Sequence, residues 1–412
     1  MIEFKRHILS NGIRLLHHFD AATRMVALNI LYDVGARDET PSHTGLAHLM
    51  EHLMFSGSEH VESFNETLER AGGISNAWTS WDVTNYYETL PAENIETAMW
   101  LESDRMRGLN VSQTNVDVQR SVVIEEFKQR YLNAPYGDLS HLLFPLAYKV
   151  HPYRVPVIGE RVEHIQGLSL ELVRSFYETH YSPDNAVLCL SGNISFERAV
   201  ELTEKWFGDI NGTSHYRRNL PQEPAQNEYR RLEVERDVPQ TLIARAYKMC
   251  GRNDALFVAS DLLSDVLANG KSSRFYQNLV LKSDVFTQAD ASVLGMLDPG
   301  VFLVTALLAE GANVADAEKM IDEQLEELIL KGVSQYELEK CVNKFMSNHL
   351  FENVGYAKKA TNLCLSELRG DANLVNDELA EYASATCSDV VNVARQILRR
   401  ENCSTLIYKA RN

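Results

Sequence analysis

The stretch that decides the fold is Gly45–Phe55, which reads Gly-Leu-Ala-His-Leu-Met-Glu-His-Leu-Met-Phe. It contains no proline, and its apolar residues recur at three- and four-residue intervals, so we predict a helix over about residues 44–56. On that helix His48 and His52 lie one turn apart on the same face, with Glu51 beside them. The alternative is an amphipathic helix whose two histidines are incidental.

Two imidazoles at this spacing form a chelate suited to zinc, and a neighbouring carboxylate can take a proton from a metal-bound water. The order His-x-x-Glu-His is the inverse of the more familiar zinc-peptidase motif. A catalytic zinc takes a third protein ligand, which spacing alone does not select. Glu125 and Glu126 stand out because they follow an apolar turn on a predicted helix at 112–132, so that one should face inward and the other outward. A solvated helix face is the alternative for this pair.

The bulk composition is that of an ordinary globular protein, with 412 residues, 45% hydrophobic and 24% charged. At roughly 150 residues per domain, the length predicts two or more domains. No run of eighteen apolar residues exists, so we expect no transmembrane helix and no membrane partner. The N-terminus lacks the apolar region of a signal peptide, and the six cysteines are widely spaced. Both features predict a cytoplasmic protein with reduced thiols.

The formal net charge of −17 argues against nucleic acid as a partner and weakly favours cationic substrates. A simpler explanation of the charge is solubility.

The order of predicted elements repeats along the chain. A strand, a helix, two strands and several helices occur in each half, which predicts an internal duplication of about 200 residues. A polar, proline-bearing stretch separates the halves, so we predict an N-terminal domain at 1–215, a linker at 216–230 and a C-terminal domain at 231–412. The counterpart of the histidine helix, at 254–267, has the apolar stripe and no histidine. The metal chemistry is therefore predicted for the first copy alone.

Three stretches resemble the pitrilysin/insulinase family of zinc peptidases: His48 to His52, Gly72-Gly73-x-x-Asn76-Ala77-x-Thr79, and Arg120-x-Val122-Val123-x-Glu125-Glu126. The chain is most similar to the short bacterial relatives of the mitochondrial processing peptidase. The resemblance implies an α+β protein of two duplicated α/β-sandwich domains of the mitochondrial-processing-peptidase-like type. Each domain would be a mostly antiparallel sheet flanked by helices.

The resemblance also implies a zinc-dependent endopeptidase that hydrolyses peptides or unfolded segments. His48, His52 and Glu126 match the zinc ligands of the family, and Glu51 matches the general base. The family usually has a second glutamate seven residues before the ligand, whereas this chain has Gln119, so the supporting role of that position is altered. The competing function is a non-catalytic or partner-dependent structural subunit of a peptidase-like complex.

Residues 75–79 match the edge strand on which such enzymes hold their substrate, with Ser75, Asn76, Ala77 and Thr79 as the substrate-binding residues. An open strand edge offers backbone donors and acceptors to any extended peptide. Asn76 would orient the substrate carbonyl or the water. Its alternative is an ordinary asparagine beside a glycine turn.

Family members often hold substrate with an arginine and a tyrosine seven residues apart in the second half. Val280 and Thr287 stand at these positions, so the clamp is expected to be absent from this chain. The family encloses substrate within four related domains, and this chain supplies two. The resemblance therefore implies a dimer, either a homodimer or a heterodimer with a sister subunit that carries the clamp.

Overall fold

A computed structural model of the chain describes residues 1–212 and 216–411; the end of the predicted N-terminal domain, at 213–215, lies outside the described residues. The chain divides by its contacts into two units, each built from three segments. Unit 1 comprises residues 1–128, 156–220 and 349–378, and unit 2 comprises residues 129–155, 221–348 and 379–412. The chain therefore passes between the units several times.

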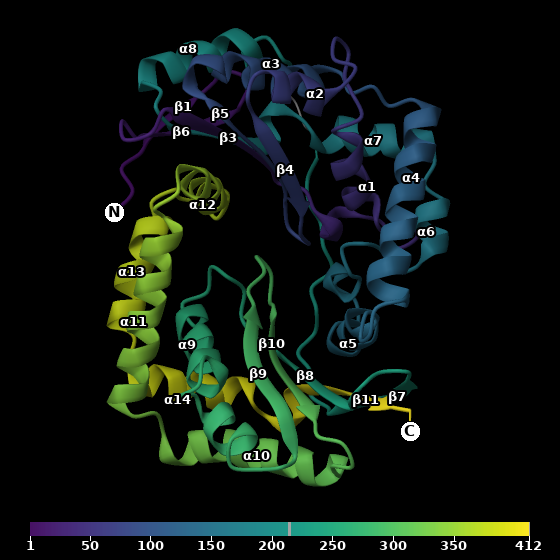
Figure 1. Ribbon diagram of the computed structural model, residues 1–412, viewed down its shortest axis with the longest axis vertical. Helices are drawn as coiled ribbons and strands as arrows, with labels where there is room; N and C mark the ends of the chain where they lie inside the picture. The colour runs from purple at the N-terminus through teal and green to yellow at the C-terminus, as the bar shows by residue number, and fades with distance from the viewer. Residues whose placement is uncertain (213–215, 412) are drawn as a thin grey trace. The chain divides into compact units, whose positions relative to one another are not determined.

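Unit 1 contains a six-stranded sheet in the order β1-β2-β6-β3-β5-β4 (Figure 1). Its central strands are rich in apolar residues and almost entirely buried, which suits strands covered on both faces. β2 and β6 run parallel, and every other neighbouring pair is antiparallel. The strands are β1 (Lys5–Ile8), β2 (Arg14–Phe19), β3 (Met25–Tyr32), β4 (Ile74–Thr79), β5 (Thr84–Pro91) and β6 (Ala186–Gly192).

Helices cover both faces of this sheet (Figure 1). α3 packs on β3 and β5, α8 packs on β2, and α12 packs on the other side against β3 and β6. The helices of unit 1 are η1 (Ala36–Asp38), α1 (Leu46–Leu53), α2 (Phe64–Arg70), η2 (Ala92–Asn94), α3 (Ile95–Arg107), α4 (Gln113–Phe127), α6 (Val162–Gln166), α7 (Leu170–His180), η5 (Pro183–Asn185), α8 (Phe196–Phe207) and α12 (Tyr356–Leu368).

α12 belongs to unit 1 although it lies late in the chain. Its residues Ala360, Leu363 and Cys364 form an apolar stripe at helical spacing, and all three are fully buried in one core cluster with Leu16 and Val187 of the sheet. Burial of this stripe against the sheet explains why residues 349–378 group with unit 1. Here the structure differs from the continuous C-terminal domain, 231–412, that the sequence predicts.

Unit 2 contains a five-stranded sheet in the order β7-β11-β8-β10-β9. β7 and β11 run parallel and the remaining pairs are antiparallel, so the order and the position of the one parallel pair repeat those of β2-β6-β3-β5-β4. The strands are β7 (Arg230–Arg236), β8 (Leu242–Lys248), β9 (Phe286–Leu294), β10 (Val301–Leu308) and β11 (Cys403–Ala410). This repeated topology is the structural form of the predicted duplication.

The core of unit 2 lies between its sheet and the helices α9, α10 and α14. The helices of this unit are α5 (Leu139–Ala147), η4 (Pro152–Arg154), α9 (Phe257–Ala268), η6 (Tyr276–Val280), α10 (Val314–Lys331), α14 (Cys387–Ile397) and η7 (Arg400–Asn402). Three further elements, namely η3 (Lys128–Leu132), α11 (Gln335–Glu352) and α13 (Leu374–Ser384), run across a boundary between the units.

The predicted fold class is confirmed: the chain is an α+β protein with two mixed, mostly antiparallel sheets flanked by helices. Among the described residues, no helix is long and apolar enough to span a membrane.

Candidate metal centre

α1 carries the two histidines, and its start is fixed by the carboxylate of Glu39. The backbone N–H groups of Gly45 and Ala47 donate to the two Glu39 oxygens at 2.9 and 2.8 Å. These donors belong to the first turn of the helix, whose N–H groups have no partner within the helix. Gly45 has φ +89°, and a Cβ there would lie 2.7 Å from the carbonyl oxygen of Ile158, so only glycine fits this entry to the helix.

The metal-binding group predicted from the sequence lies together in the structure. His48, His52 and Glu126 each offer one ligand atom, and these three atoms lie within 4.8 Å of one another. Glu126 Oε2 is 3.5 Å from His52 Nε2 and 3.8 Å from His48 Nε2. The three side chains are between 13% and 24% exposed, so the group is partly accessible to solvent.

These separations fit zinc. With metal–ligand distances near 2.1 Å, the donor atoms of a tetrahedral zinc site are about 3.4 Å apart. The two separations to Glu126, 3.5 and 3.8 Å, are close to that value. Two imidazole nitrogens and one carboxylate oxygen are a ligand set found in catalytic zinc sites, which keep a fourth position for water. Within residues 1–212 and 216–411, this is the one group of three such side chains arranged for a metal.

The two adjacent glutamates of α4 face in different directions. Glu126 faces the histidines and its side chain is 19% exposed, whereas the Glu125 side chain is 66% exposed and pairs with Lys128 at 2.7 Å. Gln119 lies two turns before Glu126 on the same helix and is half-buried, but it is not part of the three-residue group. The immediate continuation of α4 is the π-helical turn η3, a feature often found at functional sites.

Glu51 is held by the sheet. The hydroxyl of Thr79, the last residue of β4, donates to Glu51 Oε2 at 2.5 Å. The hydroxyls of Tyr86 and Tyr181 lie 3.2 Å apart within the same unit. Burial raises the pKa of both phenols, and the charge of Glu51 adds to each shift, so both tyrosines stay protonated beside this carboxylate.

β4 is the outermost strand of the unit-1 sheet and pairs only with β5. Ser75 and Ala77 are half-buried, and the side chain of the exposed Asn76 accepts from the backbone N–H of Ala77 at 2.9 Å. The hydroxyl of Ser75 donates to Asn65 Oδ1 of α2 at 3.1 Å. The backbone edge of β4 that faces away from β5 therefore has no strand paired to it within the described residues.

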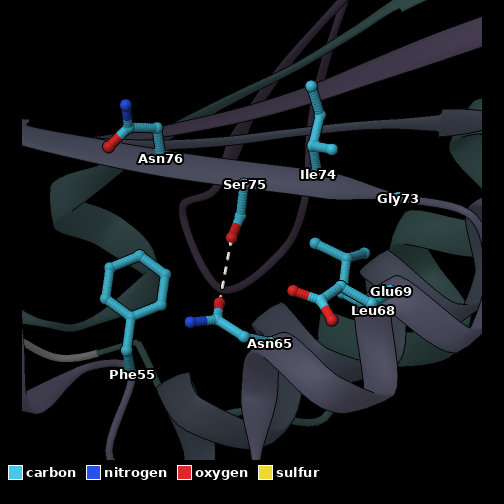
Figure 2. A pocket seen from close by; sticks show the side chains of 8 residues that line it. All are labelled: Phe55, Asn65, Leu68, Glu69, Gly73, Ile74, Ser75 and Asn76. Carbon is cyan, nitrogen blue, oxygen red and sulfur yellow. Dashed lines mark hydrogen bonds between the residues drawn. The ribbon is translucent and has the colours of Figure 1, made fainter.

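A pocket of about 320 Å³ lies beside β4 (Figure 2). Phe55 and Leu68 supply apolar side chains to its lining, and Asn65 and Glu69 of α2 and Ser75 of β4 supply polar ones. Ile74 and Asn76 also line it, but their side chains point to the opposite face of β4.

Gly73 allows β4 to start close to α2. A Cβ at this position would lie 2.7 Å from Leu68 Cδ1, so any larger residue at 73 would force the buried Leu68 side chain to shift.

The corresponding region of unit 2 has different side chains. α9, the counterpart of α1, buries Leu262, Leu263 and Val266 and contains no histidine. Val280 and Thr287 stand where the family clamp is expected, and the Thr287 hydroxyl donates to Gln240 Oε1 at 3.2 Å. Arg274 is engaged elsewhere, in an ion pair with Glu337 at 2.7 Å.

Sequence reasoning missed three features of the site. It placed Thr79 in the substrate strand and gave no contact with Glu51, and it assigned no role to Glu39 or to Phe55 in the pocket wall. Phe55 follows His52 by three residues, so helical spacing could have placed it near the same face. No local signal links Thr79 to Glu51, because they are 28 residues apart.

Comparison with known proteins identifies the family of the chain. Residues 15–155 match the model of the family described as insulinase (peptidase family M16), and residues 167–345 match the model of the peptidase M16 inactive domain. The zinc protease PqqE of Helicobacter pylori is 29% identical over 411 residues, which cover 97% of this chain and 91% of that protein.

Solved structures show the same fold. A protease from Helicobacter pylori superposes with a TM-score of 0.93 at 28% identity, over 99% of this chain and 100% of the other. A peptidase M16 inactive domain from Pseudomonas fluorescens gives a TM-score of 0.90 at 16% identity, over 100% and 98% of the two chains. The second likeness is evidence of the fold alone.

Proposed function

The chain belongs to the insulinase family of peptidases (peptidase family M16), and from that premise we propose that it is a zinc-dependent endopeptidase of peptides and unfolded segments. The observation that carries this proposal is the convergence of His48, His52 and Glu126, whose ligand atoms lie within 4.8 Å of one another. A purely structural subunit has no need of such a group.

His48, His52 and Glu126 are the proposed zinc ligands. When bound, zinc supplies a Lewis acid that polarises a carbonyl and lowers the pKa of water. Glu51 is the proposed general base, which accepts a proton on its carboxylate and passes it to the amine leaving group. Thr79 supports this role because its hydrogen bond to Oε2 restricts the rotation of the carboxylate.

We propose β4 as the substrate-binding strand. An extended peptide would add to the open edge through backbone hydrogen bonds made along Ser75, Asn76, Ala77 and Thr79. Backbone pairing gives affinity with little sequence preference, so selectivity comes from side-chain pockets such as the one beside Phe55.

The assembly proposed from the family is a dimer. Val280 and Thr287 supply neither the charge nor the phenol of the clamp, so a partner chain would hold the substrate from the other side. A homodimer would have two zinc sites and no clamp, whereas a heterodimer with a clamp-bearing sister would have both. The cytoplasm is the proposed compartment, since all six cysteines are free thiols.

The Glu51→Gln variant tests the proposal. General acid–base groups contribute about 10²- to 10⁴-fold, so cleavage of quenched peptides should fall by about that factor. Zinc content, measured on the same samples, should stay at the wild-type value because Glu51 is not a ligand. Unchanged cleavage by the variant would overturn the assignment of Glu51. A zinc-loaded wild-type chain that cleaves no peptide, alone or with a clamp-bearing relative, would overturn the function.

A further inference from the structure

Glu69 places an unpaired carboxylate in the wall of the pocket beside β4. In the described part of the chain its carboxylate makes no ion pair and no hydrogen bond, although Glu66 and Arg70 on the same helix pair with each other at 2.5 Å. Figure 2 shows Glu69 lining the same pocket as Phe55 and Ser75. The Glu69 carboxylate is thus available to pair with a positively charged group of a ligand.

The rest of the pocket suits a long, partly apolar side chain. Phe55 and Leu68 provide apolar surface for an aliphatic stem, and the volume of about 320 Å³ accommodates a large residue. Asn65 accepts a hydrogen bond from Ser75, so its carbonyl oxygen faces the pocket and adds an acceptor near Glu69. Lysine and arginine combine an apolar stem with a cationic end that seeks carboxylates and carbonyls.

The Phe55 wall is held in place before any ligand binds. Phe55 packs edge-on against Phe64 with ring centroids 5.4 Å apart, and the Arg105 guanidinium lies 5.2 Å from the Phe55 ring and 4.4 Å from the Phe64 ring. Arg105 is fully buried and its charge is matched by Glu102, so it leaves the charge of Glu69 available. A preformed wall lowers the entropic cost of binding a side chain.

We propose that Glu69 is a specificity-determining residue, which selects peptides that place an arginine or lysine side chain in this pocket. The inference rests on the proposed peptidase function. The net charge of −17 weakly favours cationic substrates, and Glu69 would be the residue that binds their positive charge. The competing occupant is an apolar side chain, for which the charge of Glu69 would be irrelevant.

A binding experiment tests the inference without requiring cleavage. The zinc-loaded Glu51→Gln chain is titrated against four fluorescent, otherwise neutral peptides that differ only in a central arginine, citrulline, norleucine or glutamate. The arginine peptide should bind roughly three- to tenfold tighter than the citrulline peptide, as expected for a partly exposed charge pair. Adding Glu69→Gln should remove this difference, and Glu69→Lys should reverse it in favour of a peptide with a central glutamate.

Glu66→Gln is the matched control, because it removes the same charge from the same helix outside the pocket. It should leave the arginine preference unchanged. Equal binding of the arginine and citrulline peptides, or equal losses in Glu69→Gln and Glu66→Gln, would overturn the inference.

A cleavage assay with Glu51 intact separates this inference from the proposed function. In a mixed peptide pool, the wild-type chain should cut at sites with a basic residue at one fixed position, and Glu69→Gln should lose that preference while still cutting. Cleavage with no basic preference would overturn the role of Glu69 and leave the peptidase function standing. A binding preference for arginine without cleavage of any peptide would support Glu69 and overturn the peptidase function.

Discussion

The Thr79 hydroxyl links β4 of the sheet to α1, the helix that carries His48, Glu51 and His52. Its hydrogen bond to Glu51 should be lost in Thr79→Val, which keeps the shape and removes the donor. Loss of a supporting partner of this kind typically costs 10- to 100-fold, so we expect kcat to fall by about that factor with zinc content unchanged. Thr79→Ser keeps the donor and should retain most of the activity. A Thr79→Val enzyme as active as Thr79→Ser would mean that the hydrogen bond does not position Glu51.

Glu125 and Glu126 provide a matched pair for testing the third ligand. Glu126→Gln should weaken zinc binding at least tenfold, because it removes one of three protein ligands from the group. Glu125→Gln should leave affinity unchanged, because Glu125 is exposed and pairs with Lys128. Competition with a zinc-binding dye measures the zinc affinity of both variants. Equal losses would show that the register of α4 has been assigned wrongly.

Glu223 predicts how the stability of unit 2 depends on pH. Burial alone would raise its pKa, but backbone N–H groups of residues 149–151 and the Lys248 ammonium hold the pKa at about 2. Because the folded pKa lies below the unfolded value of 4.5, the stabilisation is present above about pH 4.5 and is lost as the pH falls toward 2.

Glu223→Gln should therefore lower the free energy of unfolding by about 1–3 kcal/mol at pH 7, and by progressively less below pH 4.5. Urea unfolding followed at several pH values measures this difference. Glu228→Gln is the control, since the Glu228 side chain is 78% exposed, and it should have little effect at any pH. A Glu223→Gln penalty that does not shrink in acid would contradict the assigned pKa.

The sequence predicts those residues of the site that lie close together along the chain, and it misses contacts between residues that lie far apart. His48, Glu51 and His52 are within one helical turn or so of each other, so their spacing alone brings them together. Glu126 came from the family resemblance, since spacing left the choice of third ligand open. The partners of α1 that lie on other elements, Glu39 and Thr79, depend on tertiary contacts that no local pattern encodes.

At the scale of elements, α12 shows what packing adds to a correct local prediction. Its helical periodicity is evident in the sequence, but periodicity does not say which sheet the apolar stripe covers. In the structure the stripe packs on the unit-1 sheet, and the Thr361 hydroxyl donates to the buried Asn29 of β3 at 2.8 Å. This contact crosses 332 positions of the chain, beyond the reach of a sequence pattern.

Leu363→Ala tests the contribution of α12 to unit 1. Leu363 is fully buried, so removing its side chain should destabilise the protein by about 2–5 kcal/mol, through lost burial and the cavity left behind. Leu350→Ala changes the same residue type at a position that is 56% exposed, and should cost less than about 0.5 kcal/mol. Chemical unfolding measures both. Equal effects would mean that α12 is not an integral part of unit 1.

The elements absent from the prediction have weak local signals. β7 reads Arg-Arg-Leu-Glu-Val-Glu-Arg, which is too charged for a typical strand, and it forms because β11 pairs with it at the edge of the unit-2 sheet. α5 contains Pro145, a residue that normally argues against a helix interior. α13 follows α12 after a short turn, and no capping box in the sequence marks where it begins.

In the whole molecule, one arrangement of strands and helices occurs twice. The two copies differ in sequence, and only the first contains the candidate metal ligands. The two sheets repeat one strand order, and the helix that follows β3 carries His48 and His52 of the candidate metal centre, whereas the helix that follows β8 is apolar. The sequence predicted this division because the repeat of elements is visible along the chain. The interleaving of units 1 and 2 was not predictable from it, since it depends on the faces that α12 and residues 129–155 bury.

The most direct test of the account is zinc removal and reconstitution of the wild-type chain, alone and with any clamp-bearing partner it requires. Chelation should abolish peptide cleavage, and stepwise addition of Zn²⁺ should restore it in proportion, reaching its maximum at one zinc per chain. The Glu51→Gln chain should take up the same single zinc and remain inactive. Full cleavage by the zinc-free chain, or a zinc-saturated wild-type chain that cleaves no peptide, would contradict the account.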